Sequence, residues 1–168
     1  MISLIALAVF AGLLVYAACS DIASLTIPNW LSIAMTLLFA PLALAIGMPL
    51  NEIGVHYGFG VAILVVGFFL FQAKIFGGGD AKLVAAAAVW TGFAAFPTFI
   101  LGTALAGGLL ALALLSARKW QPFFAAAPAF VNRLLTPESG VPYGVAIMAG
   151  GLLALPVLPF ATNALTTP

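Results

Sequence analysis

The sequence predicts an all-α, polytopic integral membrane protein with about six transmembrane helices, its N-terminus outside and no soluble domain. Of its 168 residues, 65% are hydrophobic and 5% are charged, whereas a soluble domain carries about 25% charged residues. Several apolar stretches approach the roughly 20 residues that a helix needs to cross a bilayer. Helices are expected because lipid offers backbone groups no partner, and no segment alternates as barrel strands do. We expect residues 1–168 to form one membrane-embedded domain.

Six apolar segments, separated by Gly, Pro or charged residues, are the expected spans. They cover residues 2–19, 29–47, 55–73, 81–96, 98–116 and 141–160. The first lacks a preceding basic region and is long for the core of a signal peptide, so we interpret it as a retained helix. Pro28 and Asn29 are expected to start the second span and Pro142 the sixth, since Pro favours a first helical turn. Residues 117–140 mix aromatic residues with three cations, which is typical of a segment along the membrane surface.

The positions of the cations predict the orientation. All of them fall at two connections that are cytoplasmic if the N-terminus is outside, as the positive-inside rule requires: Lys74, Lys82, Arg118, Lys119 and Arg133. Asp21 and Asp80 then share the cytoplasmic interface, and Glu52 lies at the opposite face. Two carboxylates at one membrane depth can be brought together by helix packing.

Several classes of site are disfavoured by composition. A formal net charge of +1 argues against nucleic-acid binding, which needs a clustered basic face. The lone Cys19 excludes a disulfide framework and a CxxC zinc site. His56 has no nearby ligand partners in the sequence, so we expect an interface residue at the outer side rather than a metal ligand. The small-residue runs at 85–92 and 101–108 are expected to let helices pack closely.

The two aspartates permit a structural and a chemical interpretation. Asp80 is well placed to cap the fourth span, with the preceding glycines forming a turn, and Asp21 to be a loop residue. Ionisable groups at membrane depth are nevertheless rare and tend to mark chemistry. Three glycines also let another backbone approach a carboxylate closely. Two neighbouring carboxylates would share a proton, so that one activates a water while the other polarises a carbonyl.

Three motifs carry a resemblance to a known family. The sequence resembles the type IV prepilin peptidases, which are GxGD-type membrane aspartic proteases, in "DIASLTIPNW" from Asp21, "GGGDAKL" around Asp80 and "VPYGVAI" from Val141. The resemblance implies that Asp21 and Asp80 are the catalytic pair and that the substrate is a prepilin or pseudopilin precursor. Cleavage of its short basic leader would occur at the cytoplasmic face, without a metal or cofactor. The "VPYGVA" motif and the compact size are similar to the small Flp/Tad-type members.

The resemblance also implies a location and a set of site-shaping residues. The location is the bacterial cytoplasmic (inner) membrane, with the lipid bilayer as second partner, while the oligomeric state is left open. The residues expected to bind substrate or shape the site are Gly77, Gly78, Gly79, Lys82, Pro28, Asn29, Pro142, Tyr143 and Gly144.

Two departures from the family pattern bear on the activities that the resemblance implies. Many members carry a basic residue two positions after the first aspartate, where this chain has Ala23. Larger members carry a cysteine-rich segment after the first span and a second, N-methyltransferase activity. The corresponding connection here is short and cysteine-free, so no methyltransferase activity is expected. The alternatives are a small transporter that uses the aspartates as proton or cation sites, and a non-enzymatic membrane subunit of a secretion or pilus machine.

Overall fold

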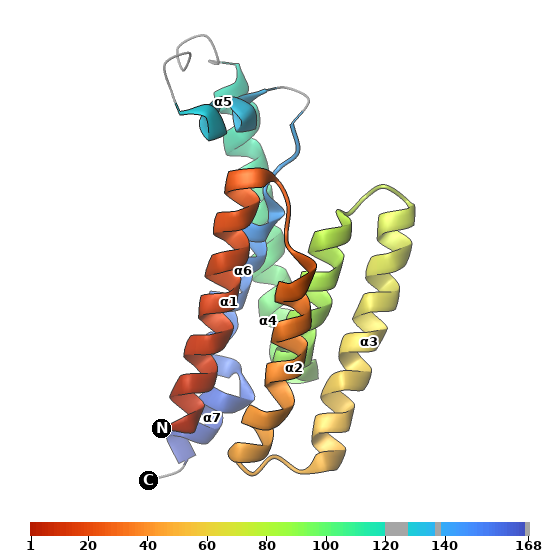
Figure 1. Ribbon diagram of the computed structural model, residues 1–168, viewed down its shortest axis with the longest axis vertical. Helices are drawn as coiled ribbons and strands as arrows, with labels where there is room; N and C mark the ends of the chain where they lie inside the picture. The colour runs from red at the N-terminus through yellow and green to blue at the C-terminus, as the bar shows by residue number, and fades with distance from the viewer. Residues whose placement is uncertain (120–127, 137–138, 167–168) are drawn as a thin grey trace.

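The computed structural model describes residues 1–119, 128–136 and 139–166. All the regular elements within these ranges are helices, arranged as an elongated bundle (Figure 1). They are α1 (Ile2–Ser24), α2 (Asn29–Ala45), α3 (Leu50–Gln72), α4 (Gly78–Arg118), α5 (Ala129–Leu135), α6 (Tyr143–Ala154), the 3₁₀ turn η2 (Leu155–Val157) and α7 (Pro159–Thr166).

Four helical stretches among the described residues are long and apolar enough to cross a membrane. Among the described residues, α1, α3, α4 and the stretch Tyr143–Leu165 meet that standard by length and composition, and the apolar α2 is shorter. Mean hydropathy and length therefore agree with the prediction of an all-α, polytopic membrane protein.

α1 and α2 are separated by a short loop whose ends the local sequence defines. α1 continues to Ser24, beyond the expected end at residue 19, because nothing between them breaks a helix. It ends where Leu25 adopts a left-handed conformation with φ 53°. Pro28, in an extended conformation, is the N-cap of α2. α2 ends at Ala45. Gly47 follows with φ +83°, and the Met48 N–H donates to the Ala43 carbonyl over 3.0 Å, as in a helix that terminates at a left-handed glycine.

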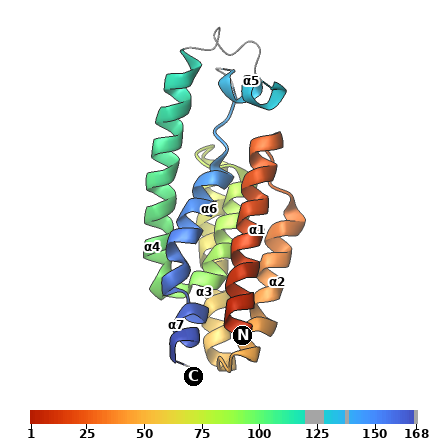
Figure 2. The ribbon, with the colours of Figure 1, turned by 90° about the vertical axis from the view of Figure 1, so that its left-hand side faces the viewer.

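α4 consists of two helical segments that meet at Gly92. This residue has φ 54° and ψ −168°, a conformation that glycine adopts far more readily than other residues. A straight helix of 41 residues would extend about 60 Å. Both ends of α4 nevertheless lie at one end of the bundle, because Asp80 shares a cavity with Gly140 and Arg118 donates to the Gly140 carbonyl. Figure 2 shows the second segment returning along the bundle.

The six expected spans correspond to helical segments with shifted boundaries. The fourth and fifth are the two segments of α4, but the chain turns at Gly92 rather than beside Pro97, which lies inside the second segment. α3 begins at Leu50 instead of residue 55, because Pro49 is its N-cap. The sixth span is interrupted by η2, which contains Pro156, and resumes as α7 at Pro159.

The first segment of α4 forms the centre of the bundle. All of its residues from Leu83 to Gly92 are buried. Trp90 packs its ring 5.3 Å from that of Phe10 in α1 and 5.8 Å from that of Phe39 in α2, measured between centroids, and its indole N–H donates to the Met35 carbonyl over 2.8 Å. The runs of small residues pack closely as expected, since a Cβ on Gly102 would lie 3.1 Å from the Cα of Gly150 in α6.

His56 is a buried helix-capping residue, so the prediction of an interface residue is wrong. Its ring stacks on Phe39 with centroids 5.0 Å apart, and Nδ1 lies 2.7 Å from the Val89 carbonyl. The Val89 carbonyl lies in the last turn before Gly92, where the helical backbone is interrupted, and a carbonyl buried without a partner is costly. His56 supplies a donor to it.

Candidate active site

Asp21 lies in the last turns of α1 and not in the loop that follows, contrary to the structural interpretation above. Its side chain is buried, and Oδ2 accepts a hydrogen bond from the Gly144 N–H over 2.7 Å. Gly144 is the second residue of α6, so the carboxylate sits at the positive end of that helix. A Cβ on Gly144 would lie 2.9 Å from the Asp21 Cβ. Glycine at this position therefore lets α6 approach the carboxylate.

Asp80 is the third residue of α4, and the expectation that it is the N-cap is wrong. The N-cap is Gly77, while Gly78 and Gly79 are already helical. The Asp80 carboxylate folds back over Gly77, where an added Cβ would collide with Oδ2. This carboxylate too lies at the positive end of a helix. It is close enough to Asp21 for the two carboxylates to interact electrostatically.

One cavity of about 450 Å³ joins the two aspartates. It opens at the end of the bundle where α1 ends and α4 begins (Figure 1). Its lining comes from the α1–α2 loop, the start of α4 and the segment before α6: Asp21, Leu25, Thr26, Ile27, Asn29, Gly77, Gly78, Gly79, Asp80, Gly140 and Val141. Two acids that are remote in the sequence are thus presented to one space.

The glycine run lines this cavity and also meets demands of the chain's own packing. A Cβ on Gly78 would be 3.3 Å from the Phe71 ring, and one on Gly79 would be 3.2 Å from the Ile27 Cβ. A Cβ on Gly77 would likewise meet the Asp80 carboxylate. Each of the three glycines is therefore required by a close contact within the protein itself, independently of any substrate.

The other residues expected to shape the site divide between the cavity and its surroundings. Pro28 and Pro142 are the N-caps of α2 and α6. Asn29 lines the cavity, and its Oδ1 accepts a hydrogen bond from the Lys82 ammonium over 2.9 Å. Lys82 does not line the aspartate cavity. Tyr143 lines a neighbouring cavity of about 650 Å³ together with Asp80.

Arg118 holds the segment before α6 in place and Arg133 joins α5 to the end of α1, two roles that the sequence does not predict. Arg118 donates to the carbonyls of Leu134 (3.2 Å), Ser139 (2.6 Å) and Gly140 (3.2 Å). Arg133 in α5 donates to the carbonyl of Ala23 near the end of α1. The clustering of cations in 117–140 is the sequence signal for these contacts, and the location of this segment along the membrane surface stays a prediction. Residues 120–127 of that stretch lie outside the described residues.

Fold and geometry together define a multi-pass, all-α membrane protein with a two-carboxylate cavity at one end of its bundle. Residues 8–112, which include Asp21 and Asp80, match the model of the type IV leader peptidase family. The chain therefore belongs to the type IV leader peptidase family, as its motifs predict, and this membership implies a peptidase. No curated protein and no solved structure matches the chain well enough to add to this assignment.

Proposed function

We propose that this protein is an aspartic endopeptidase that removes the short basic leader from Flp-type prepilins or pseudopilins, with Asp21 and Asp80 as its catalytic pair. The observation that carries the proposal is the shared cavity, which is lined by both carboxylates within the matched family region. No cofactor or metal takes part in the proposed reaction.

The two carboxylates divide the chemistry of peptide hydrolysis between them. One, ionised, removes a proton from a water that attacks the scissile carbonyl, while the other, protonated, polarises that carbonyl and later protonates the leaving amine. The two residues titrate as a unit, so the base is not assigned to either one. The helix N-termini of α4 and α6 stabilise the negative charge on the pair.

The position of the cavity suits a substrate that joins a polar leader to an apolar helix. The carboxylates lie at the end of the bundle that carries the cations, which is cytoplasmic under the positive-inside rule. A precursor whose helix lies in the bacterial inner membrane presents its leader junction at this depth. The scissile bond and the carboxylates then meet at the interface, where water is available.

The alternative of a non-enzymatic subunit gives each aspartate a capping role at a helix N-terminus, but it does not account for the one cavity that both line. Asp21 does cap α6 through the Gly144 N–H, and a cap alone tolerates Asn as well as Asp. The transporter alternative needs a polar route through the bundle. The deep polar side chains His56, Thr91 and Thr103 instead bond to nearby backbone carbonyls.

The test is processing of a Flp-type pilin precursor co-expressed with wild type, Asp21→Asn or Asp80→Asn, followed by gel mobility and by mass spectrometry of the cut end. We expect both variants to lose about 10³-fold or more of the processing rate, as loss of a catalytic acid does. Thermal unfolding of each variant checks that the loss of processing is not a loss of fold. We expect Asp21→Asn to stay folded, because the Asn oxygen can still accept the hydrogen bond from the Gly144 N–H.

Glu52→Gln is the matched control. It removes an acid of similar chemistry at the opposite end of the bundle, where Glu52 lies in the first turn of α3, and we expect wild-type processing. If either Asp→Asn variant cuts the precursor at a rate comparable to wild type, the catalytic pair is assigned wrongly.

A further inference from the structure

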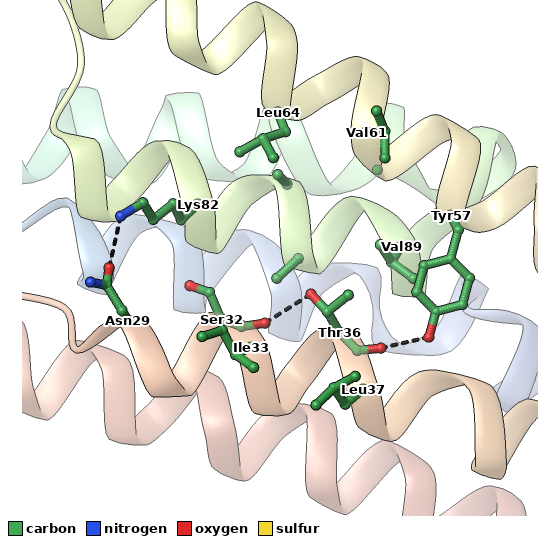
Figure 3. A pocket seen from close by; sticks show the side chains of 13 residues that line it. Asn29, Ser32, Ile33, Thr36, Leu37, Tyr57, Val61, Leu64, Lys82 and Val89 are labelled. Atoms are coloured by element: carbon green, nitrogen blue, oxygen red, sulfur yellow. Dashed lines mark hydrogen bonds between the residues drawn. The ribbon is translucent and has the colours of Figure 1, made fainter.

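A second hollow runs down the side of the bundle between α2, α3 and the first segment of α4 (Figure 3). We call it the lateral groove, and its volume is about 520 Å³. Ile33 and Leu37 form its α2 wall, and Val61 and Leu64 form its α3 wall. The full lining is Asn29, Ser32, Ile33, Thr36, Leu37, Tyr57, Gly60, Val61, Leu64, Lys82, Ala85, Ala86 and Val89.

Four polar side chains that line the lateral groove have hydrogen-bond partners within the protein: Tyr57, Thr36, Lys82 and Asn29. The Tyr57 hydroxyl donates to the Thr36 carbonyl over 2.7 Å, and the Thr36 hydroxyl donates to the Ser32 carbonyl over 2.8 Å (Figure 3). Lys82 donates to Asn29 at the end of the groove nearest the aspartates. With these four side chains partnered, the groove offers its occupant mainly the apolar surface of its two walls.

The walls are exposed at the depth of the membrane spans. Ile33 is 57%, Leu37 67%, Val61 59% and Leu64 43% exposed. The floor between them holds Ala85 and Ala86, both buried. Small residues flanked by larger apolar ones let another helix approach closely, as at transmembrane helix interfaces. The groove thus has the shape and chemistry to receive one face of an apolar helix.

The lateral groove begins where the aspartate cavity ends. Asn29 lines both spaces, and from Asn29 the groove follows α2 to Leu37, which is roughly 12 Å or two helical turns. A chain that enters the aspartate cavity as a leader and continues into the bilayer as a helix must leave along the side of the bundle. The groove is the depression that continues from the cavity in that direction.

We infer that the lateral groove binds the first two turns of the substrate's apolar helix and so sets the position of the scissile bond against the aspartates. This inference rests on the proposed function, because it takes the substrate to be a leader joined to a transmembrane helix. A lipid acyl chain is the competing occupant, and the experiment below distinguishes the two.

The experiment places a photo-crosslinking amino acid at Ile33 or Leu64, one on each wall, in the Asp80→Asn background to prevent turnover. The matched control position is Leu109, which is 69% exposed and lies on the second segment of α4, away from the groove. Each protein is irradiated in membranes with the Flp-type precursor. We expect adducts with the apolar helix of the precursor at both wall positions, about tenfold above the yield at Leu109, as specific rather than random contact requires.

The outcomes separate this inference from the proposed function. If wild type processes the precursor but adducts at Ile33 and Leu64 do not exceed those at Leu109, or contain only lipid, the groove assignment is wrong and the peptidase stands. If the wall positions give precursor adducts but wild type cuts nothing, the groove binds the helix and the proposed chemistry fails. If wild type does not process the precursor and the wall positions give no precursor adducts, both proposals are overturned.

Discussion

At the scale of single residues, the site depends on the absence of a side chain at Gly144. The hydrogen bond from its N–H to Asp21 requires α6 to lie against the end of α1. An added Cβ would lie 2.9 Å from the Asp21 Cβ, 3.0 Å from Oδ2 and 3.2 Å from the Ala17 carbonyl. One methyl group would therefore displace the carboxylate or the helix end that orients it.

We expect Gly144→Ala to lower kcat/KM for precursor processing by about tenfold or more, because displacements of about 1 Å near reacting groups have large effects on rate. Thermal unfolding of the same sample separates this effect from a loss of fold. Gly12→Ala is the control, since a Cβ on Gly12 in α1 meets nothing within 4 Å. Equal rates for the two variants would show that Asp21 tolerates movement.

At the scale of secondary-structure elements, the turn in α4 determines which end of the bundle receives the next helix. Gly92 provides the backbone conformation, and His56 donates a hydrogen bond to the Val89 carbonyl in the turn before it. A Cβ on Gly92 would lie 2.6 Å from the His56 Cε1. The conformation and the close neighbour both require glycine.

We expect Gly92→Ala to reduce the free energy of unfolding by at least about 2 kcal/mol, because a strained backbone and a collision add at this position. The comparison is Gly108→Ala in the second segment of α4, where a Cβ meets nothing within 4 Å and helix propensity predicts a neutral or slightly stabilising change. Unfolding followed in detergent measures both. A Gly92→Ala protein as stable as Gly108→Ala would contradict this account of the turn.

The elements that the sequence predicts well are those set by local composition. Apolar length predicts the helices, and Pro28 and Pro142 mark the starts of α2 and α6 as expected. The sequence predicts the break between the fourth and fifth spans at Pro97, because proline is the stronger local signal, whereas the chain turns at Gly92. Gly92 is identified only by its conformation and its contact with His56, which come from tertiary packing.

In the candidate site too, the sequence predicts what short motifs contain and does not predict contacts between residues that are remote in sequence. The motifs indicate that Asp21 and Asp80 belong together, and one cavity contains both. The bond from Gly144 to Asp21, the hold of Arg118 on the segment before α6 and the lateral groove depend on residues remote in sequence. No local pattern encodes such contacts.

At the scale of the whole molecule, charge is distributed unequally between the two ends of the bundle. Glu52 and Gly47 line a shallow pocket beside α7 at one end. At the other end, Lys74 shares a cavity with Asp80, and Arg133 reaches the end of α1. The carboxylate pair thus lies at the end of the bundle that carries positive charge.

This asymmetry predicts the orientation in the bilayer. In a Cys19→Ser background, we expect Glu52→Cys to react with a membrane-impermeant maleimide in intact cells and Ile75→Cys, an exposed position in the α3–α4 loop, to react only after permeabilisation. Labelling of both positions from one side would contradict the topology. Labelling with the sides exchanged would place the aspartates outside.

The bond between Asp21 and Gly144 joins α1 to α6 across 123 residues of sequence. During synthesis, α1 enters the bilayer long before α6 leaves the ribosome. Until α6 arrives, Asp21 has neither its hydrogen-bond donor nor the helix end that faces it. A nascent chain therefore completes this half of the cavity only after α6 has been inserted and has packed against α1.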